Sequence, residues 1–152
     1  DLSWVNPEDL PAATNPCRSP VRVLVRTIFD GDTFVAQSED GDETIRIIGV
    51  DTPETSSGQC YAAEAKIFLI QQIAGRHVWL TFDCACEDFY ERTLAYVHLG
   101  TNEQDFLERQ LLLQGYAKAF PFDDTDTFET LFAQDEATAR SNGSGGWTDC
   151  DW

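Results

Sequence analysis

Three consecutive segments with the alternating pattern of β-strands limit most strongly what this chain can fold into. The first, residues 21–29, carries valine at alternate positions. The second, residues 33–37, leads to an Asp40-Gly41 pair, and the third, residues 44–50, follows that pair closely. Because Asp-Gly between two such segments is a strong hairpin signal, the three segments are predicted to form a β-meander.

The remainder of the chain is predicted to contain two further strands and three helices. The strands are expected at 77–82 and 93–99, and the helices at 62–74, 105–114 and 128–140. In the first helix, Ala65, Phe68 and Ile73 fall on one face, and Gly75 supplies a C-terminal stop. Three strands, a helix, two strands and two helices is the element order of an α+β fold, a five-stranded OB-type β-barrel with three α-helices.

The length of 152 residues suits one domain with a short extension. Prolines interrupt every periodic pattern in residues 1–20, which are predicted to form an N-terminal arm with Trp4 as its anchor. The domain is predicted over residues 21–148 and a C-terminal tail over residues 149–152. The longest apolar runs are only a few residues, so the sequence predicts no membrane span.

Acidic residues greatly outnumber basic ones, with 27 Asp plus Glu, 10 Lys plus Arg and a formal net charge of −17. This balance argues against a protein held on nucleic acid by a broad basic surface, but it leaves room for a local cationic site. Only Lys66 and Lys118 are lysines, and the other cations are arginines. Two interpretations stay open. The acidic surface is either an adaptation to a salty medium, which screens the repulsion between its charges, or an ordinary means of solubility.

Five cysteines are present, and no two of them have the CxxC spacing of a zinc or redox motif. Disulfides formed in an oxidising compartment are therefore predicted. The favoured pairing joins Cys17 to Cys150 and joins Cys60 to either Cys84 or Cys86. The protein is accordingly expected to be secreted or exposed at the cell envelope, with a signal peptide already removed.

Acidic residues stand where strands of the meander end. Asp30 and Asp32 lie at the junction of the first two strands, and Asp51 directly follows the third. Asp32 and Asp51, together with a backbone carbonyl oxygen and water, would make a site for a hard cation such as calcium. Neither segment matches the calcium-binding loop of EF-hand proteins, so the site would be assembled from separate strands.

Two arginines and one glutamate complete a set with recognisable chemistry. Arg46 lies inside the third strand, and Arg92 opens the fifth. Their planar guanidinium groups fit phosphate oxygens and can stabilise the charge that develops in phosphoryl transfer. Glu54, just after the third strand, can orient or deprotonate an attacking water. A metal, two arginines and a glutamate are the parts needed to hydrolyse a phosphodiester.

Taken in order, several segments make the chain resemble the staphylococcal nuclease, or thermonuclease, family. The matching segments are FDGDTFV at 29–35, IRIIGVDTPE at 45–54, CYAAEA at 60–65, ERTLAYV at 91–97, QGYAKAF at 114–120, and EATAR at 136–140 followed by Trp147. The resemblance implies the OB-type barrel and a calcium-dependent nuclease. It also implies cleavage of DNA and RNA, preferably single-stranded, that leaves 3′-phosphate and 5′-hydroxyl ends.

The resemblance also implies a calcium site. Asp32 and Asp51 would bind the Ca²⁺ through their side chains, and Thr52 would bind it through its backbone carbonyl. Asp30 would support the ion through water. The expected partner is a nucleic-acid substrate, and the expected assembly is a monomer.

The catalytic and substrate-binding roles follow from the same resemblance. Arg46 and Arg92 would clamp the scissile phosphate, and Glu54 would activate or position the attacking water. Tyr90 would contact phosphate, and Lys118 would bind the substrate.

Two departures from the family pattern keep an alternative open. Glu91 stands where the family usually has glycine, and the loop after Lys118 is acidic. In that loop, Phe120 and Phe122 are either base-stacking residues or ordinary packing residues. The alternative function is a catalytically weak or inactive nuclease-like domain that binds nucleic acid or protein. An OB barrel for another ligand, such as an oligosaccharide, would not need the arginines and carboxylates.

Overall fold

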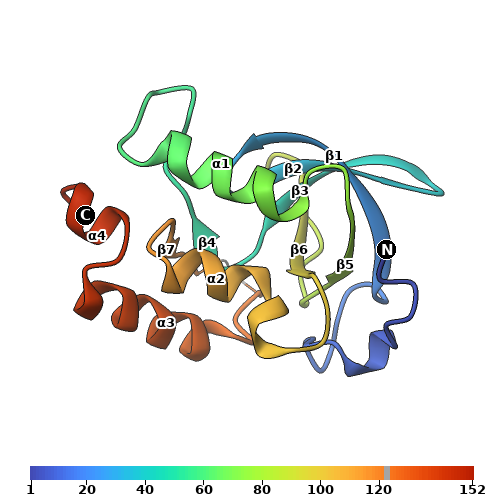
Figure 1. Cartoon of the computed structure of the whole chain (residues 1–152). Coiled ribbons are helices and arrows are strands. Elements are labelled where there is room, and N and C mark those ends of the chain that lie inside the picture. The colour runs from blue at the N-terminus through green and yellow to red at the C-terminus, as the bar shows by residue number, and fades with distance from the viewer. Residues whose placement is uncertain (122–123) are drawn as a thin grey trace.

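Five strands close into a barrel in the computed structural model, which describes residues 1–121 and 124–152 (Figure 1). The strand order around the barrel is β1-β2-β3-β6-β5, and β1 pairs with both β2 and β5. The bounds are β1 Val21–Asp30, β2 Thr33–Ser38, β3 Gly41–Ile47, β5 His77–Thr81 and β6 Thr93–His98. The predicted α+β fold with a five-stranded OB-type barrel is confirmed.

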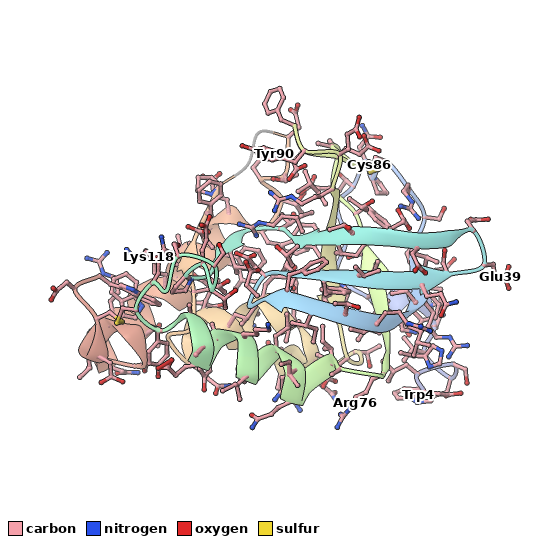
Figure 2. All side chains as sticks on the ribbon, turned by 90° about the horizontal axis from the view of Figure 1, so that it is seen from above. Trp4, Glu39, Arg76, Cys86, Tyr90 and Lys118 are labelled. Atoms are coloured by element: carbon pink, nitrogen blue, oxygen red, sulfur yellow. A yellow bond between two sulfur atoms is a disulfide. The ribbon has the colours of Figure 1, made fainter. Side chains whose placement is uncertain are left out.

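The predicted meander is present, with a tighter turn than the sequence indicated. Ser38 pairs with Gly41, so only Glu39 and Asp40 separate β2 from β3. Gly41 has a φ of 112°, a conformation that favours glycine, which explains why it follows the turn. In Figure 2, Glu39 marks the tip of this hairpin, which extends away from the helices.

Strand β1 changes direction before it reaches the next strand. Its pairing with β2 shifts register between Val25 and Ile28 and again between Ile28 and Asp30. Such irregularities bend a strand and re-aim its side chains. The bend therefore lies in the segment that carries Asp30 toward the open end of the barrel.

Helices pack against the barrel and against one another. Their bounds are α1 Ala62–Ile73, α2 Leu107–Leu113, α3 Glu129–Asn142 and α4 Gly146–Asp149. Helix α1 packs against β1, whereas α2 packs against both β6 and α3 (Figure 1). The three predicted helices are present, but α2 begins at Leu107 because Glu103–Asp105 form a separate 3₁₀ helix, η2. No helix of the described residues is long and apolar enough to cross a membrane.

Besides η2, four short elements were not predicted. Strand β4, Val50–Asp51, pairs with β7, Lys118–Ala119, in a two-stranded sheet outside the barrel. Helix α4 forms close to the C-terminus, and a 3₁₀ helix, η1 Pro7–Asp9, forms in the N-terminal arm. Each is too short to leave a periodic pattern in the sequence.

The barrel interior and the helical layer share a hydrophobic core. All residues of β6 are buried, because one face of the strand lines the barrel and the other meets helices. The Tyr96 ring lies edge-on to Phe106 and Phe128, with centroid distances of 6.0 and 4.9 Å. Edge-to-face aromatic pairs of this kind add to the stabilisation from buried area.

The N-terminal arm is held on the barrel, but not by Trp4 as predicted. Trp4 is 72% exposed, whereas Val5 and Leu10 are buried. The Leu2 carbonyl also accepts a hydrogen bond of 2.9 Å from the Trp79 indole. The smaller apolar residues anchor the arm because a proline-broken chain can bury them without inserting a large ring.

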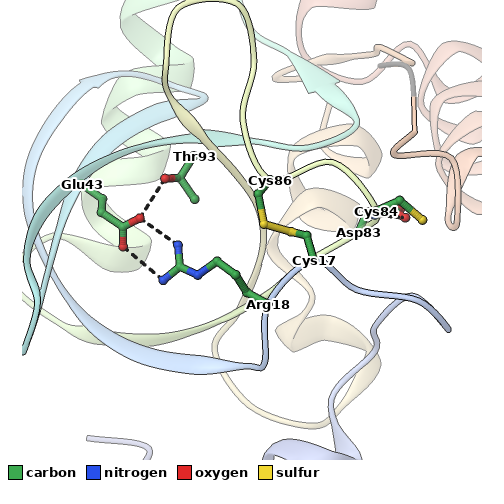
Figure 3. The surroundings of a disulfide bond; sticks show 7 residues. All are labelled: Cys17, Arg18, Glu43, Asp83, Cys84, Cys86 and Thr93. Carbon is green, nitrogen blue, oxygen red and sulfur yellow. Dashed lines mark hydrogen bonds and ion pairs between the residues drawn. A yellow bond between two sulfur atoms is a disulfide. The ribbon is translucent and has the colours of Figure 1, made fainter.

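Two disulfides form, and the predicted pairing was wrong. Cys17 pairs with Cys86, and Cys84 beside them is free (Figure 3). Cys60 pairs with Cys150. The arm brings the first pair together, since the Cys17 amide donates to the Asp83 carbonyl at 2.8 Å.

The second disulfide joins the segment before α1 to the end of the chain. The Cys60 sulfur lies 3.6 Å from the Asp149 carbonyl oxygen of α4, so α4 places Cys150 against Cys60. That short helix was not predicted, and the sequence alone therefore gave no reason to prefer this pair.

Removal of the Cys60–Cys150 bridge by a double serine substitution is expected to lower the free energy of unfolding by about 4 kcal/mol. The bridge spans 90 residues, and closing so long a loop restricts the unfolded chain. Cys84→Ser is the matched control, because this thiol is exposed and unpaired, and it should change the stability by less than about 0.5 kcal/mol. Urea unfolding measures both values. Equal stabilities of the double variant and the wild type would contradict the prediction.

A buried carboxyl group on α2 makes stability depend on pH. Glu108 is fully buried, and its Oε1 accepts from the Val97 amide at 3.1 Å, while Oε2 has no hydrogen-bond partner among the described residues. Burial raises its pKa well above the ordinary value of 4.5. The folded state therefore holds this proton more tightly than the unfolded state, so stability falls as the pH rises above 4.5.

Glu108→Gln is expected to remove this dependence. The amide keeps the size of the side chain and can still accept from Val97, but it never carries a charge. The free energy of unfolding of the variant relative to the wild type should rise by about 1.4 kcal/mol for each pH unit above the ordinary glutamate pKa, until Glu108 ionises in the folded protein. Urea titrations between pH 4 and pH 8 measure the difference, and parallel stability curves would contradict it.

Candidate active site

Eight of the nine predicted site residues line one cavity of about 380 Å³ at the end of the barrel. They are Asp30, Asp32, Arg46, Asp51, Thr52, Glu54, Tyr90 and Arg92. The ends of β1 and β3, strand β4 and the loop before β6 supply them. Residues widely separated in the sequence are thus gathered at one point, as a hydrolytic site requires.

Arg46 lies at the centre of the cluster, and its guanidinium group is fixed from several sides. Nη1 donates to the carbonyl oxygens of Ile47 and Val50, both at 2.7 Å. Nη2 lies 3.3 Å from Asp32 Oδ2 and 3.5 Å from Asp51 Oδ1. A buried arginine held this way keeps one orientation, so it loses little side-chain entropy when it binds an anion.

Asp32 is the most buried of the carboxylates that line this cavity, with 5% of its surface exposed. Its Oδ1 accepts from the Thr33 hydroxyl at 2.8 Å, and its Oδ2 accepts from the Thr52 amide at 2.9 Å. The second bond ties the end of β1–β2 to the segment after β4. It therefore fixes Asp32 relative to Asp51 and Thr52.

The other two aspartates have pKa values above the ordinary aspartate value. Burial, with the nearby charge of Asp32, raises the pKa of Asp30 to about 7. Burial also raises the pKa of Asp51, although the Arg46 guanidinium opposes the shift. One buried arginine thus lies against two carboxyl groups, Asp32 and Asp51, while Asp30 interacts with Asp32 and its Oδ1 has no hydrogen-bond partner among the described residues. This surplus of negative charge is the environment that a divalent cation relieves.

The donor set fits a hard cation that keeps part of its water shell. Among residues 1–121 and 124–152, no three Asp, Glu, His or Cys side chains converge as a complete metal cage. Two carboxylates, Asp32 and Asp51, do converge on one nitrogen of Arg46, with the Thr52 backbone beside them. Calcium accepts carboxylate, carbonyl and water oxygens, so these residues can hold it with water completing the shell.

Glu54 lines the same cavity from an exposed position. Its backbone is held by Gln59, whose side-chain oxygen accepts from the Glu54 amide at 2.8 Å and whose own amide donates to the Glu54 carbonyl at 3.2 Å. The Glu54 carboxylate has no hydrogen-bond or ion-pair partner within the described part of the chain. It is therefore available to accept a proton from water.

Arg92 belongs to a loop that Asp88 organises. Asp88 Oδ1 accepts from the amides of Tyr90 and Arg92 at 2.9 and 3.0 Å, and Oδ2 lies 2.7 Å from Nε and Nη2 of Arg92. The guanidinium carbon lies 5.3 Å from the centre of the Tyr90 ring. The sequence reasoning missed Asp88, although its position four residues before Arg92 was a usable signal.

Lys118 lies beside the cavity rather than in it. The Lys118 backbone pairs with that of Asp51 across the β4–β7 sheet. Its Nζ lies 5.4 and 5.9 Å from the ring centres of Trp152 and Trp147, in a neighbouring hollow that Asp51 and Thr52 also line. Figure 2 places Lys118 and Glu39 toward opposite ends of the molecule. Of the two phenylalanines considered for stacking, Phe120 lines the cavity and Phe122 lies outside the described residues.

Glu91 has the backbone conformation that the family's glycine suggested, with a φ of 61°. A side chain in this left-handed region costs about 1 kcal/mol relative to an ordinary conformation. The residue is also exposed and adjacent to Arg92, so its charge lies close to the cationic part of the site.

Glu91→Gly and Glu91→Gln are expected to separate the strain from the charge. The glycine variant removes both, so its free energy of unfolding should rise by up to about 1 kcal/mol, whereas the glutamine variant keeps the strain and should unfold like the wild type. Both variants should lower KM for a nucleic-acid substrate about two- to fivefold, because each removes a repelling charge. Unchanged KM values in both variants would show that the Glu91 charge does not act on substrate.

Comparison with known proteins agrees with the fold. Residues 44–149 match the family described as staphylococcal nuclease homologue. The thermonuclease of Staphylococcus intermedius is 35% identical over 121 residues, which are 77% of this chain and 70% of that protein. The thermonuclease of Staphylococcus hyicus is 36% identical over 96 residues, 60% of this chain and 55% of that protein. Endonuclease YncB of Bacillus subtilis is 29% identical over 134 residues, 84% of this chain and 62% of that protein.

An OB-type barrel with carboxylates and arginines at one end defines the class of protein. The chain belongs to the staphylococcal nuclease family. It spans from about half to 70% of the length of these relatives.

Proposed function

We propose that this protein is a calcium-dependent nuclease that hydrolyses phosphodiester bonds in DNA and RNA. The observation that carries the proposal is the single cavity that holds two arginines, the aspartates and Glu54. The relatives named thermonuclease and endonuclease support a metal-dependent hydrolase of nucleic acid. The two disulfides support action in an oxidising, extracellular compartment.

In this proposal the arginines bind the scissile phosphate. Arg46 is fixed by backbone carbonyls and Asp32, and Arg92 by Asp88, so neither has to be ordered when substrate arrives. Their N–H groups stabilise the negative charge that grows on the equatorial phosphate oxygens. Asp32, Asp51 and the Thr52 carbonyl would hold Ca²⁺, which when bound supplies further charge neutralisation at the phosphate.

Glu54 is the proposed base. Its carboxylate accepts a proton from a water molecule as the water oxygen forms a bond to phosphorus. The bond between phosphorus and the 5′ oxygen breaks, that oxygen takes a proton from solvent water, and Glu54 later returns its proton to solvent. The products are a 3′-phosphate and a 5′-hydroxyl end. A single strand is the preferred substrate, since a cavity at the end of a barrel reaches the phosphate more readily when the bases are unpaired.

End-group analysis tests the proposed reaction. The wild-type chain is incubated with denatured DNA, with RNA and with duplex DNA, in calcium and in EDTA. The proposal predicts cutting in calcium alone, faster on denatured DNA than on duplex, with new ends that polynucleotide kinase labels without prior phosphatase treatment. Ends that need phosphatase before labelling would overturn the assigned direction of cleavage. No cutting by the folded protein would overturn the nuclease itself.

A further inference from the structure

We propose that Phe89 is a base-stacking platform that, together with Tyr90 and Phe120, holds single-stranded substrate beside the catalytic cavity. The proposal rests on the proposed nuclease function and adds to it the residue that selects the substrate. All three aromatic residues line the cavity that holds Arg46 and Arg92.

The exposure of Phe89 is the first observation. Its side chain is fully exposed, and Tyr90 beside it is 80% exposed. Phe120, which reaches the same cavity from the segment after β7, is 41% exposed. Single exposed apolar residues are common on protein surfaces. Three aromatic side chains from two separate segments on the rim of one polar cavity form instead a surface suited to flat rings.

The loop that carries Phe89 is held firmly. The residue lies between Asp88 and Tyr90, and Asp88 accepts bonds from the Tyr90 and Arg92 amides. The Asp88 amide in turn donates to the Arg92 carbonyl at 3.1 Å, and the Cys17–Cys86 disulfide fixes the start of the loop (Figure 3). Figure 2 shows Tyr90 at the outer edge of the molecule, on this loop. A ring on a fixed loop can stack on a base with a small loss of conformational entropy.

The charge of the protein supplies the second observation. The net charge is −17, and the cavity lining contains five carboxylates, Asp30, Asp32, Asp51, Glu54 and Asp88, but only two arginines. Binding by release of counterions from phosphates needs many cationic contacts, which this cavity lacks. Stacking on bases requires no positive charge, so it can supply the missing affinity.

Phe89 also lies where a bound strand would leave the cavity. Phe89 and Asp88 line both the catalytic cavity and a neighbouring hollow that Leu94 and Pro121 border. A strand that passes from one to the other crosses the Phe89 ring. Paired bases are stacked within a duplex and cannot lie on this ring, so the platform favours single strands.

Cleavage kinetics of matched variants test the proposal. Phe89→Ala should raise KM for an oligothymidylate about tenfold with kcat within about twofold, whereas Phe89→Tyr should retain the wild-type KM. With the wild type, an abasic site next to the scissile bond should also raise KM about tenfold. With Phe89→Ala, the same abasic site should raise KM little further. Trp4→Ala is the control, because this aromatic ring is also largely exposed, at 72%, but lies on the N-terminal arm.

The salt dependence gives a second readout. With two arginines on phosphates, KM for a single strand should rise only about sevenfold when salt rises fourfold. A steeper rise would show that cationic contacts hold the strand. The role of Phe89 would be overturned if Phe89→Ala left KM unchanged. It would also be overturned if Phe89→Ala raised KM equally for the intact and the abasic strand.

Binding separates this proposal from the nuclease itself. Fluorescence anisotropy of a labelled oligothymidylate in EDTA, where no cleavage is expected, measures affinity alone. If the wild type binds the strand but does not cut it, and Phe89→Ala binds about tenfold more weakly, the role of Phe89 is supported and the nuclease activity is contradicted. If the wild type cuts DNA and Phe89→Ala binds the strand as tightly as the wild type, the nuclease activity is supported and the role of Phe89 is contradicted. If the folded wild type neither binds nor cuts, both are wrong.

Discussion

Substitution of Arg46 by alanine is expected to abolish cleavage and to destabilise the fold by about 3–5 kcal/mol. The substitution leaves the buried Asp32 carboxylate without its guanidinium partner and removes the donor to the Ile47 and Val50 carbonyls. It also removes one of the two cations that face the scissile phosphate, which should lower kcat at least a thousandfold. Steady-state cleavage and urea unfolding measure the two effects.

Two further variants keep this prediction testable if the alanine variant does not fold. Arg46→Lys keeps the charge but loses the planar fork, so kcat should fall by about a hundredfold or more while most of the stability is retained. Arg109→Ala breaks a comparable pair between α2 and α3, where Nε lies 2.9 Å from the buried Asp135. It should cost stability without lowering kcat. A similar loss of kcat in Arg109→Ala would show that Arg46 acts only through stability.

Glu54→Gln is expected to lower kcat by about 10²–10⁴-fold without a change in stability. The amide has the size of the carboxylate but cannot accept a proton from water. Because Glu54 is exposed and its carboxylate has no partner in the described part of the chain, its free energy of unfolding should stay within about 0.5 kcal/mol of the wild type. The matched control is Glu64→Gln, an exposed glutamate in the first turn of α1. Full activity of Glu54→Gln would remove Glu54 from the mechanism.

Much of the barrel could be predicted because its strands leave a local signal. Alternation in residues 21–50 and the helical periods in residues 62–74 and 128–140 depend on neighbours in the sequence. Strands β4 and β7 leave no such signal, since two residues each cannot show a period. They pair residues that are far apart in the sequence, Asp51 with Lys118, so they depend on the path of the chain through the whole fold.

The site was predicted from residue types and from the family resemblance, and its geometry was not. Chemistry indicated Asp32, Asp51 and the arginines, but the carbonyl contacts of Arg46 depend on the path of the chain after β3. Phe89 was missed because a phenylalanine gives no sign in the sequence of whether it will be buried. The disulfide pairs were wrong for the same reason, since they join segments whose proximity is a result of the fold.

The most direct test of the whole account is cleavage of denatured DNA by the wild-type protein as calcium is titrated from zero. We predict no cleavage in EDTA and a saturable rise in rate with calcium, because Asp32 and Asp51 bring two carboxylates to one point beside Arg46. The added metal should restore the rate after EDTA treatment. Equal cleavage in EDTA and in calcium would contradict the metal site, and no cleavage by folded protein at any calcium concentration would contradict the nuclease.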